Sequence, residues 1–157
     1  MEARCLLLDP LSESPVVLLR ERGGNLVLPI WVGHPEAQAI AVALEEVREA
    51  RPTTHDLLLQ VLHALACDLL RVEVWALRER TYFGRLVLCR NGEEVAVDAR
   101  PSDAIALAVR TRTEICVDPG VLEQALAPDV ETAGEEERQL REWLEKSSPE
   151  TLSKYKM

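Results

Sequence analysis

Hydrophobic positions near the start of the chain follow the spacing and composition of β-strands. Strand-like runs cover residues 3–8, Pro15 to Glu21 and Leu26 to Val32. Gly23-Gly24 supplies the flexible residues that a tight turn between the second and third runs requires. We therefore expect these three segments to form an N-terminal antiparallel unit.

A helical spacing of three and four residues follows the third strand. One helix is predicted from His34 to about Glu49, with a buried face made of Ala37, Ile40, Ala41, Leu44 and Val47. A second helix is predicted from a cap at Thr53 or Thr54 to about Cys67. Its expected core stripe consists of Leu57, Leu58, Val61, Leu62 and Leu65.

The next segment returns to alternation and predicts more strands. Val72, Val74 and Ala76 alternate with other side chains in one strand, Thr81 to Cys89 forms the next, and Glu94 to Asp98 follows a hairpin turn at Asn91-Gly92. Beyond them we expect a helix from Ser102 to about Thr111, a strand at 115–117 and a short helix from Asp118-Pro119 to Ala127. The fold class is therefore α+β, with a mixed or antiparallel sheet and helices packed on it.

The domain organisation predicted is one compact domain, residues 1–127, followed by a tail, residues 128–157. Within the tail, residues 128–134 are typical of a linker and 135–146 of a charged helix. That helix carries a narrow apolar seam formed by Leu140, Trp143 and Leu144, which is suited to contact with a partner.

Composition narrows the class of protein. The chain has 157 residues, of which 47% are hydrophobic and only 4% aromatic, so the expected core is aliphatic. No apolar run approaches the roughly 20 residues that span a bilayer, so we expect no membrane partner and a cytoplasmic location.

The cysteines at 5, 67, 89 and 116 have no metal-ligand spacing and are expected to be buried, reduced thiols. A net charge of −9 argues against a broad basic groove for nucleic acid.

Two short motifs stand out, Arg51-Pro52-Thr53 and Arg100-Pro101-Ser102, and each comes just before an acid and an apolar run. Proline suits the first turn of a helix, and Thr or Ser suits its N-cap. Such helix ends bind anions readily because free backbone N–H groups point outward there. If the fold brings the two motifs together, they would form one site for an anionic ligand.

The same motifs carry a resemblance to a known family. Leu28-Pro29-Ile30-Trp31-Val32-Gly33 with Glu36-Ala37, then Arg51 to Leu57, then Asp98 to Ala108 occur in the order and at the spacing of the bifunctional nuclease domain. The chain resembles this family from about residue 2 to 127, and its charged C-terminal extension is similar to that of bacterial members. The resemblance implies a compact α+β fold, a homodimer, and nuclease activity on both DNA and RNA.

Residue chemistry suggests roles within such a site, along two routes to phosphodiester hydrolysis. A histidine can act as base while arginines hold the phosphate, or carboxylates can hold a divalent metal ion. We expect the catalytic residues to be His55, Asp56 and Asp103, and the phosphate-binding residues to be Arg51, Arg100 and Ser102. Tentative ligands for Mg²⁺ or Mn²⁺ are Glu36, Asp98 and Asp103, and no organic cofactor is expected.

Each of these residues also has a structural interpretation. Asp56 and Asp103 would stabilise helix starts by roughly 0.3–1 kcal/mol without any catalysis, and the arginines could be their ion-pair partners. His55 could hydrogen-bond within the first turn, and Asp98 could cap a loop. Trp31 and Trp75 are better suited to packing than to base stacking. The alternative function is therefore a non-catalytic module that binds an anion or nucleotide, or that assembles as a dimer.

Overall fold

Two β-sheets and four helices make up the part of the chain that the computed structural model describes, which is residues 1–9, 12–47 and 49–126. Sheet A is antiparallel, in the order β1-β2-β3, with strands β1 (Glu2–Leu8), β2 (Pro15–Arg20) and β3 (Val27–Trp31). Sheet B is mixed, in the order β6-β5-β4-β7, with strands β4 (Cys67–Arg78), β5 (Thr81–Arg90), β6 (Glu93–Ala99) and β7 (Glu114–Val117). The helices are α1 (His34–Leu44), α2 (Thr54–Ala64), α3 (Pro101–Thr111) and α4 (Pro119–Leu126).

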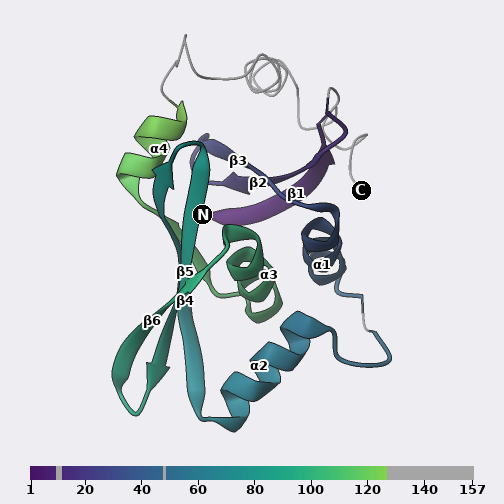
Figure 1. The fold of residues 1–157 in the computed structure, drawn as a ribbon, viewed down its shortest axis with the longest axis vertical. Coiled ribbons are helices and arrows are strands. Elements are labelled where there is room, and N and C mark those ends of the chain that lie inside the picture. Colours follow the sequence, from purple (N-terminus) through teal and green to yellow (C-terminus); the bar gives the residue numbers. More distant parts are fainter. Residues whose placement is uncertain (10–11, 48, 127–157) are drawn as a thin grey trace.

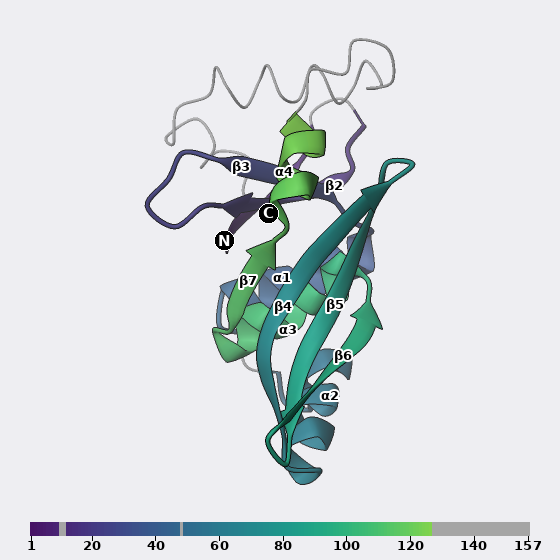
Figure 2. The same cartoon turned by 90° about the vertical axis from the view of Figure 1, so that its left-hand side faces the viewer.

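The arrangement of these elements confirms the predicted α+β class. Helix α3 lies at the centre, with sheet B on one side, α1 on the other and sheet A above (Figure 1). Figure 2 shows that α1, α2 and α3 lie on the same face of sheet B. The helices of the described residues are all too short or too polar to cross a membrane.

The core is aliphatic, as the composition predicts, and α3 is its centre. Ile105 and Leu107 are 0% and 1% exposed, and small alanines on either side of them let sheet B and α1 approach the helix closely. Val72 and Val74 of β4 and Leu19 and Leu28 of sheet A complete the same cluster. Because these side chains come from both sheets, their burial holds the two sheets and the central helix together.

Both hairpins of sheet B turn through residues with left-handed backbone angles. Asn91 and Gly92 have φ of 52° and 83°, so the predicted hairpin is confirmed. The turn from β4 to β5 uses Glu79 and Arg80, at φ of 47° and 65°. Glu and Arg seldom adopt this conformation, so the sequence contained no signal for that turn.

Two helices end earlier than the sequence pattern predicts. Helix α1 ends at Leu44 rather than near Glu49, because Glu46 adopts φ of 53° and Val47 is 49% exposed. Helix α2 ends at Ala64, and Ala66 adopts φ of 50° before the chain enters β4. Cys67 is therefore the first residue of a strand and not the last residue of a helix. None of the four cysteines forms a disulfide, but they are half-buried rather than fully buried.

The largest error concerns the predicted core stripe of α2. Of its five residues only Leu62 is half-buried against the core, where it is joined by Leu59. The other four are exposed, at 55%, 40%, 44% and 54% for Leu57, Leu58, Val61 and Leu65. The predicted helix is confirmed, but it packs on the core through the adjacent side, which carries Leu59 and Leu62. The predicted linker and tail helix, with the seam of Leu140, Trp143 and Leu144, lie outside the described residues.

Candidate functional site

Three helices begin close together, and each carries an acid at its third position. Helix α1 begins after its N-cap Gly33, α2 after Thr53 and α3 after Arg100. The acids at the third helical positions are therefore Glu36, Asp56 and Asp103. A negative charge at this place is favourable because it faces the positive end of the helix dipole.

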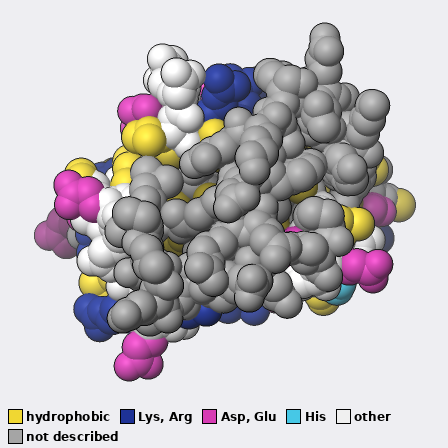
Figure 3. All heavy atoms as spheres, turned by 90° about the horizontal axis from the view of Figure 1, so that it is seen from above, with side chains coloured by type: hydrophobic (Ala, Val, Ile, Leu, Met, Phe, Trp, Pro, Cys, Tyr) yellow, Lys and Arg dark blue, Asp and Glu magenta, His cyan; other side chains and the backbone are white. Residues whose placement is uncertain are grey.

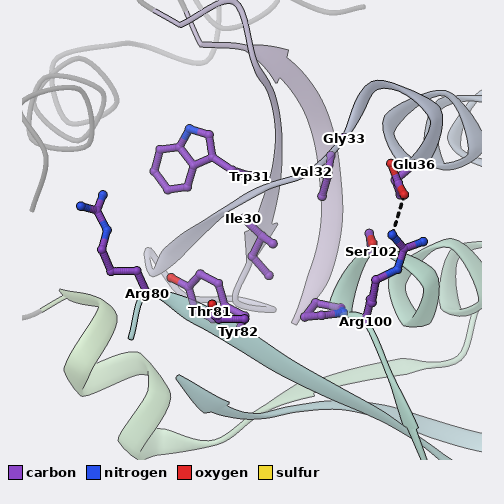
Figure 4. Close-up of a pocket in the computed structure, with 11 residues that line it drawn as sticks. Ile30, Trp31, Val32, Gly33, Glu36, Arg80, Thr81, Tyr82, Arg100 and Ser102 are labelled. Atoms are coloured by element: carbon purple, nitrogen blue, oxygen red, sulfur yellow. Dashed lines mark hydrogen bonds and ion pairs between the residues drawn. The ribbon is translucent and has the colours of Figure 1, made fainter. Parts of the chain in front are cut away.

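Arg100 links two of these helix starts. Its Nε donates a hydrogen bond to Oδ2 of Asp103 at 2.8 Å, and its Nη2 donates to Oδ1 at 3.2 Å. Its Nη1 donates to Oε1 of Glu36 at 2.7 Å (Figure 4). The hydrogen bonds to Asp103, followed by those to Glu36, raise the pKa of Arg100. The Arg100 side chain is nevertheless 65% exposed, so it remains open to solvent.

His55 adds the third helix start to the same cluster. Its Nε2 lies 3.2 Å from Oδ1 of Asp103, the oxygen that also accepts from Arg100. Burial on its own would raise the pKa of Asp103, but hydrogen bonds from Arg100 and His55 outweigh it and hold that pKa below its usual value. An ionised Asp103 accepts hydrogen bonds only, so it orients the imidazole with Nε2 as the donor. The lone pair then lies on Nδ1.

Asp56, by contrast, is engaged in holding the fold. Its Oδ2 accepts hydrogen bonds from the backbone N–H and the hydroxyl of Thr53, which forms a capping box. Its Oδ1 accepts from Nε of Arg110 at 2.8 Å. The hydrogen bond from the Thr53 hydroxyl is the largest cause that lowers the pKa of Asp56 from 3.8 to about 2, and the Arg110 contact adds to it. These contacts support the structural interpretation of Asp56.

Arg110 is a residue that sequence reasoning missed. Its side chain is only 8% exposed, and besides Asp56 it donates to the carbonyl oxygens of Ala39 and Ala106. It therefore joins α1, α2 and α3 at one point. The available signal was its position seven residues after Asp103, which places both side chains on the same side of α3.

Gly84 of β5 holds the start of α3 in place, and it too was missed. A Cβ at this position would lie 2.8 Å from the carbonyl oxygen of Ala99 and 3.1 Å from Cα of Pro101. Only glycine lets the backbone of β5 pass so close to the Arg100-Pro101 turn. Ser102, which we expected as the N-cap, is instead the second residue of α3 and is 8% exposed.

Two of the predicted site residues lie apart from this cluster. Arg51 is exposed, and it makes no hydrogen bond or ion pair with the residues that the structure describes. Asp98 is exposed on β6, paired through the strand with Arg85, and its side chain makes no hydrogen bond or ion pair within the described part. The two Arg-Pro motifs therefore meet through His55 and Asp103 and not through their two arginines.

A cleft with a volume of about 440 Å³ opens beside the cluster. Figure 4 shows Glu36, Arg100 and Ser102 at one end and Trp31 and Arg80 toward the other. Its lining comes from the end of β3, the start of α1, the turn between β4 and β5, and the start of α3. The cleft thus brings three of the predicted site residues to a surface that a ligand can reach.

The predicted metal ligands do not form a metal centre as they are placed here. Glu36 and Asp103 both hold Arg100, and Asp98 is on a separate strand. Among residues 1–9, 12–47 and 49–126, no three His, Cys, Asp or Glu side chains are grouped so that they could hold a metal ion. A divalent cation would have to displace the guanidinium, so these residues do not fit the predicted Mg²⁺ or Mn²⁺ site.

The surface charge agrees with the acidic composition. Around the edges of the face shown in Figure 3, described basic and acidic side chains both appear at several separate places. On the outer side of sheet B, Arg71 and Arg85 both bind Glu73, so positive and negative groups neutralise each other there as well. Basic and acidic side chains therefore occur together in both of these described regions.

Comparison with known proteins identifies the family. The family model described as the bifunctional nuclease domain matches residues 17–129. An uncharacterized protein of Mycobacterium tuberculosis (strain H37Rv) is 43% identical over 120 residues, which cover 75% of this chain and 71% of that protein. Bifunctional nuclease 1 of Arabidopsis thaliana is 34% identical over 113 residues, and bifunctional nuclease 1 of Oryza sativa subsp. japonica is 30% identical over 115.

The plant proteins are much longer than the matched region. The aligned part covers 70% and 71% of this chain but only 35% of each of these two plant proteins. The match to the family model, in contrast, takes in the starts of all three helices that build the cluster. With most of its length and every part of the candidate site inside that match, the chain belongs to the bifunctional nuclease domain family.

Proposed function

We propose that this protein hydrolyses phosphodiester bonds in DNA and RNA, with His55 as general base and Arg100 as the cation that holds the phosphate. The observation that carries the proposal is the meeting of His55 and Arg100 on one oxygen of Asp103, beside an open cleft. Membership in the family and the names of the plant relatives support the same activity.

The chemistry follows from the residues of the cluster. An enzyme that cleaves both DNA and RNA cannot depend on the ribose 2′-hydroxyl, so water is the nucleophile. His55 would take a proton from that water through Nδ1 while the water oxygen bonds to phosphorus. The P–O bond to the leaving oxygen then breaks, and that oxygen takes a proton from the imidazolium or from solvent. Arg100 would offset the negative charge that grows on the phosphoryl oxygens.

Removal of His55 tests this proposal directly. His55→Ala should lower the rate of cleavage of single-stranded DNA and RNA by about 10²–10⁴-fold, because a positioned base contributes about that factor. Added imidazole should restore part of the rate, which a purely structural histidine would not allow. His63→Ala is the matched control, because His63 lies exposed on the same helix. Equal rates for the wild type and His55→Ala, purified in parallel, would refute the proposal.

Metal assistance stays a prediction. On the route through His55, cleavage continues in the presence of EDTA, because no protein ligand set has to be filled. Loss of cleavage in EDTA with recovery on adding Mg²⁺ or Mn²⁺ would instead favour the carboxylate route, which requires Arg100 to move from Glu36 and Asp103.

The second candidate function is a non-catalytic assembly module, and one observation favours it. Leu57, Leu58, Val61 and Leu65 form an uncharged stripe on the exposed side of α2, and such stripes mark interaction surfaces. We expect a second copy of the chain to cover this stripe and so form the homodimer that the resemblance implies. Light scattering should give twice the chain mass for the wild type and the chain mass for Leu57→Glu/Val61→Glu. A monomeric wild type would contradict this.

A further inference from the structure

The cleft beside Arg100 differs in chemistry from one end to the other. At one end lie the guanidinium of Arg100 and the buried Ser102, and at the other lies the indole of Trp31 (Figure 4). Tyr82 contributes a second aromatic ring to the lining. A cation separated from aromatic rings within one small cavity matches a ligand with an anionic group and a flat apolar part.

Trp31 is held in a fixed orientation before any ligand arrives. Its Nε1 donates a hydrogen bond to Oδ2 of Asp9 at 3.3 Å, and Asp9 is only 1% exposed. The same carboxylate oxygen accepts from the hydroxyl of Ser12 at 2.9 Å. The ring also packs against the small cluster formed by Leu7, Val16 and Leu18. A ring held in this way loses little conformational entropy when a ligand stacks on it.

The size of the cleft limits the ligand to one unit. A volume of about 440 Å³ lies within the range of small-molecule pockets, roughly 300–1,000 Å³, and is too small for a stacked duplex. A base that enters such a pocket must already be unstacked and unpaired, which is the state of bases in single strands, loops and ends.

We propose that this cleft is a nucleotide subsite, in which one unstacked base lies against Trp31 while its phosphate binds at Arg100. The inference rests on the proposed nuclease function in one respect, which is the expectation that the bound strand runs from the cleft toward His55. Binding of a nucleotide in the cleft does not itself require hydrolysis. The preferred substrate is then a single strand rather than a duplex.

The charge of the protein makes this subsite more important. With a net charge of −9 and several of the described arginines paired to acids, the protein attracts a long phosphate backbone weakly. Binding then depends on one base and one phosphate. The logarithm of the binding constant for a single strand should therefore fall with the logarithm of salt concentration at a slope near −0.7, the value for about one phosphate contact.

Fluorescence of Trp31 provides the test. The double variant Trp75→Phe/Trp143→Phe leaves Trp31 as the sole tryptophan. Titration with 5′-AMP should quench its emission, adenosine should do so more weakly, and inorganic phosphate should leave it unchanged. A single-stranded DNA oligonucleotide should compete with 5′-AMP, and a blunt duplex of the same sequence should not. Emission that 5′-AMP leaves unchanged up to millimolar concentration would overturn the inference.

Two further variants show where the ligand binds. Arg100→Ala should weaken 5′-AMP binding by about tenfold or more while adenosine binding is retained. Arg78→Ala is the matched control, because Arg78 stacks on Trp75 and does not line the cleft. This variant should keep the 5′-AMP affinity within about twofold of the wild-type value. Equal losses in the two variants would contradict the assignment.

Cleavage kinetics separate this inference from the proposed function. Trp31→Ala should raise KM for single-stranded DNA with a smaller change in kcat, and Trp31→Phe, which keeps a ring, should recover most of the loss. Nucleotide binding without any cleavage would refute the nuclease function and leave the subsite standing. Cleavage with an unchanged KM in Trp31→Ala would refute the subsite and leave the nuclease function standing.

Discussion

Helices α2 and α3 begin with nearly the same sequence motif but differ strongly in how much of each helix is buried. Each has an Arg-Pro-hydroxyl tripeptide at its start and carries an acid at its third position. Yet α3 buries six of its residues, whereas α2 buries none. The capping signal therefore determines where a helix begins, and the position of the helix in the fold determines what it contacts.

The two motifs also differ by two residues in register, and this offset changes their chemistry. Arg100 is itself the N-cap of α3, so its side chain reaches Asp103 one turn later. In α2 the N-cap is Thr53, which places Arg51 two residues before the N-cap. One arginine thus enters the cluster and the other faces solvent. Similar sequence motifs consequently do not imply equivalent roles.

The largest expected effect comes from the difference in burial. Ile105→Ala in α3 should lower the free energy of unfolding by about 2–5 kcal/mol, since it opens a cavity in a core that is fully closed. Val61→Ala in α2 should change the free energy of unfolding of the isolated monomer by less than about 0.5 kcal/mol. Denaturant unfolding in dilute solution measures both values. A loss at Val61 as large as that at Ile105 would mean that α2 is covered even in the monomer.

The two acids at the third helical positions should separate activity from stability. Asp103→Asn should lower kcat for single-stranded DNA by about 100-fold, because His55 loses the carboxylate that orients it, while thermal stability changes little. Asp56→Asn should keep kcat within about threefold but lower Tm by roughly 3–5 °C, because the capping box and the Arg110 contact weaken. The reverse pattern in steady-state kinetics and thermal melts would exchange the two roles.

Acid should weaken the anchoring of α2 through Asp56. Its pKa is lowered from 3.8 to about 2 in the folded protein, so its stabilising contribution is complete above about pH 4 and is lost as pH falls toward 2. With 36% of the side chain exposed, we expect about 1 kcal/mol after allowance for screening. Unfolding free energies of the wild type and Asp56→Asn should therefore converge between pH 4 and pH 2. A difference in unfolding free energy between the two proteins that stays constant from pH 4 to pH 2 would contradict this.

The smallest expected effect concerns the two arginines that differ in register. Arg51→Ala should leave the free energy of unfolding unchanged within about 0.3 kcal/mol, since Arg51 contacts none of the described acids. Arg100→Ala should lower it by more than Arg51→Ala does, because the ion pairs with Glu36 and Asp103 are lost, although such exposed pairs contribute little each. Chemical unfolding of both variants at low salt provides the comparison. A marked loss at Arg51 would show that it has a structural partner.

Helix starts were predictable from the sequence because their signals are local. The capping of α2 at Thr53 and the starts of α1, α3 and α4 depend on Pro, Thr and acids within one turn. The hairpin at Asn91-Gly92 was likewise confirmed, because few residue pairs accept two left-handed angles. The turn at Glu79 and Arg80 was missed, since its angles are imposed by the pairing of β4 with β5.

The candidate site was predictable only in part, for the same reason. The residue types of the cluster and the resemblance to the family are properties of the sequence, and the structure brings three of the candidates, His55, Arg100 and Asp103, into contact. Arg110 and Gly84 were missed because their importance depends on segments far away in the chain, Asp56 in one case and Ala99 in the other.

Local chemistry thus determined the order of strands and helices, the places where helices begin, and the set of candidate site residues. Packing between distant segments decided which side of α2 is buried, which arginine joins Asp103, and that Trp31 lines the same cleft as Arg100. The physical reason is that capping and turn energies depend on a few neighbouring residues. Burial and ion pairing depend on which segments the folded chain brings within contact.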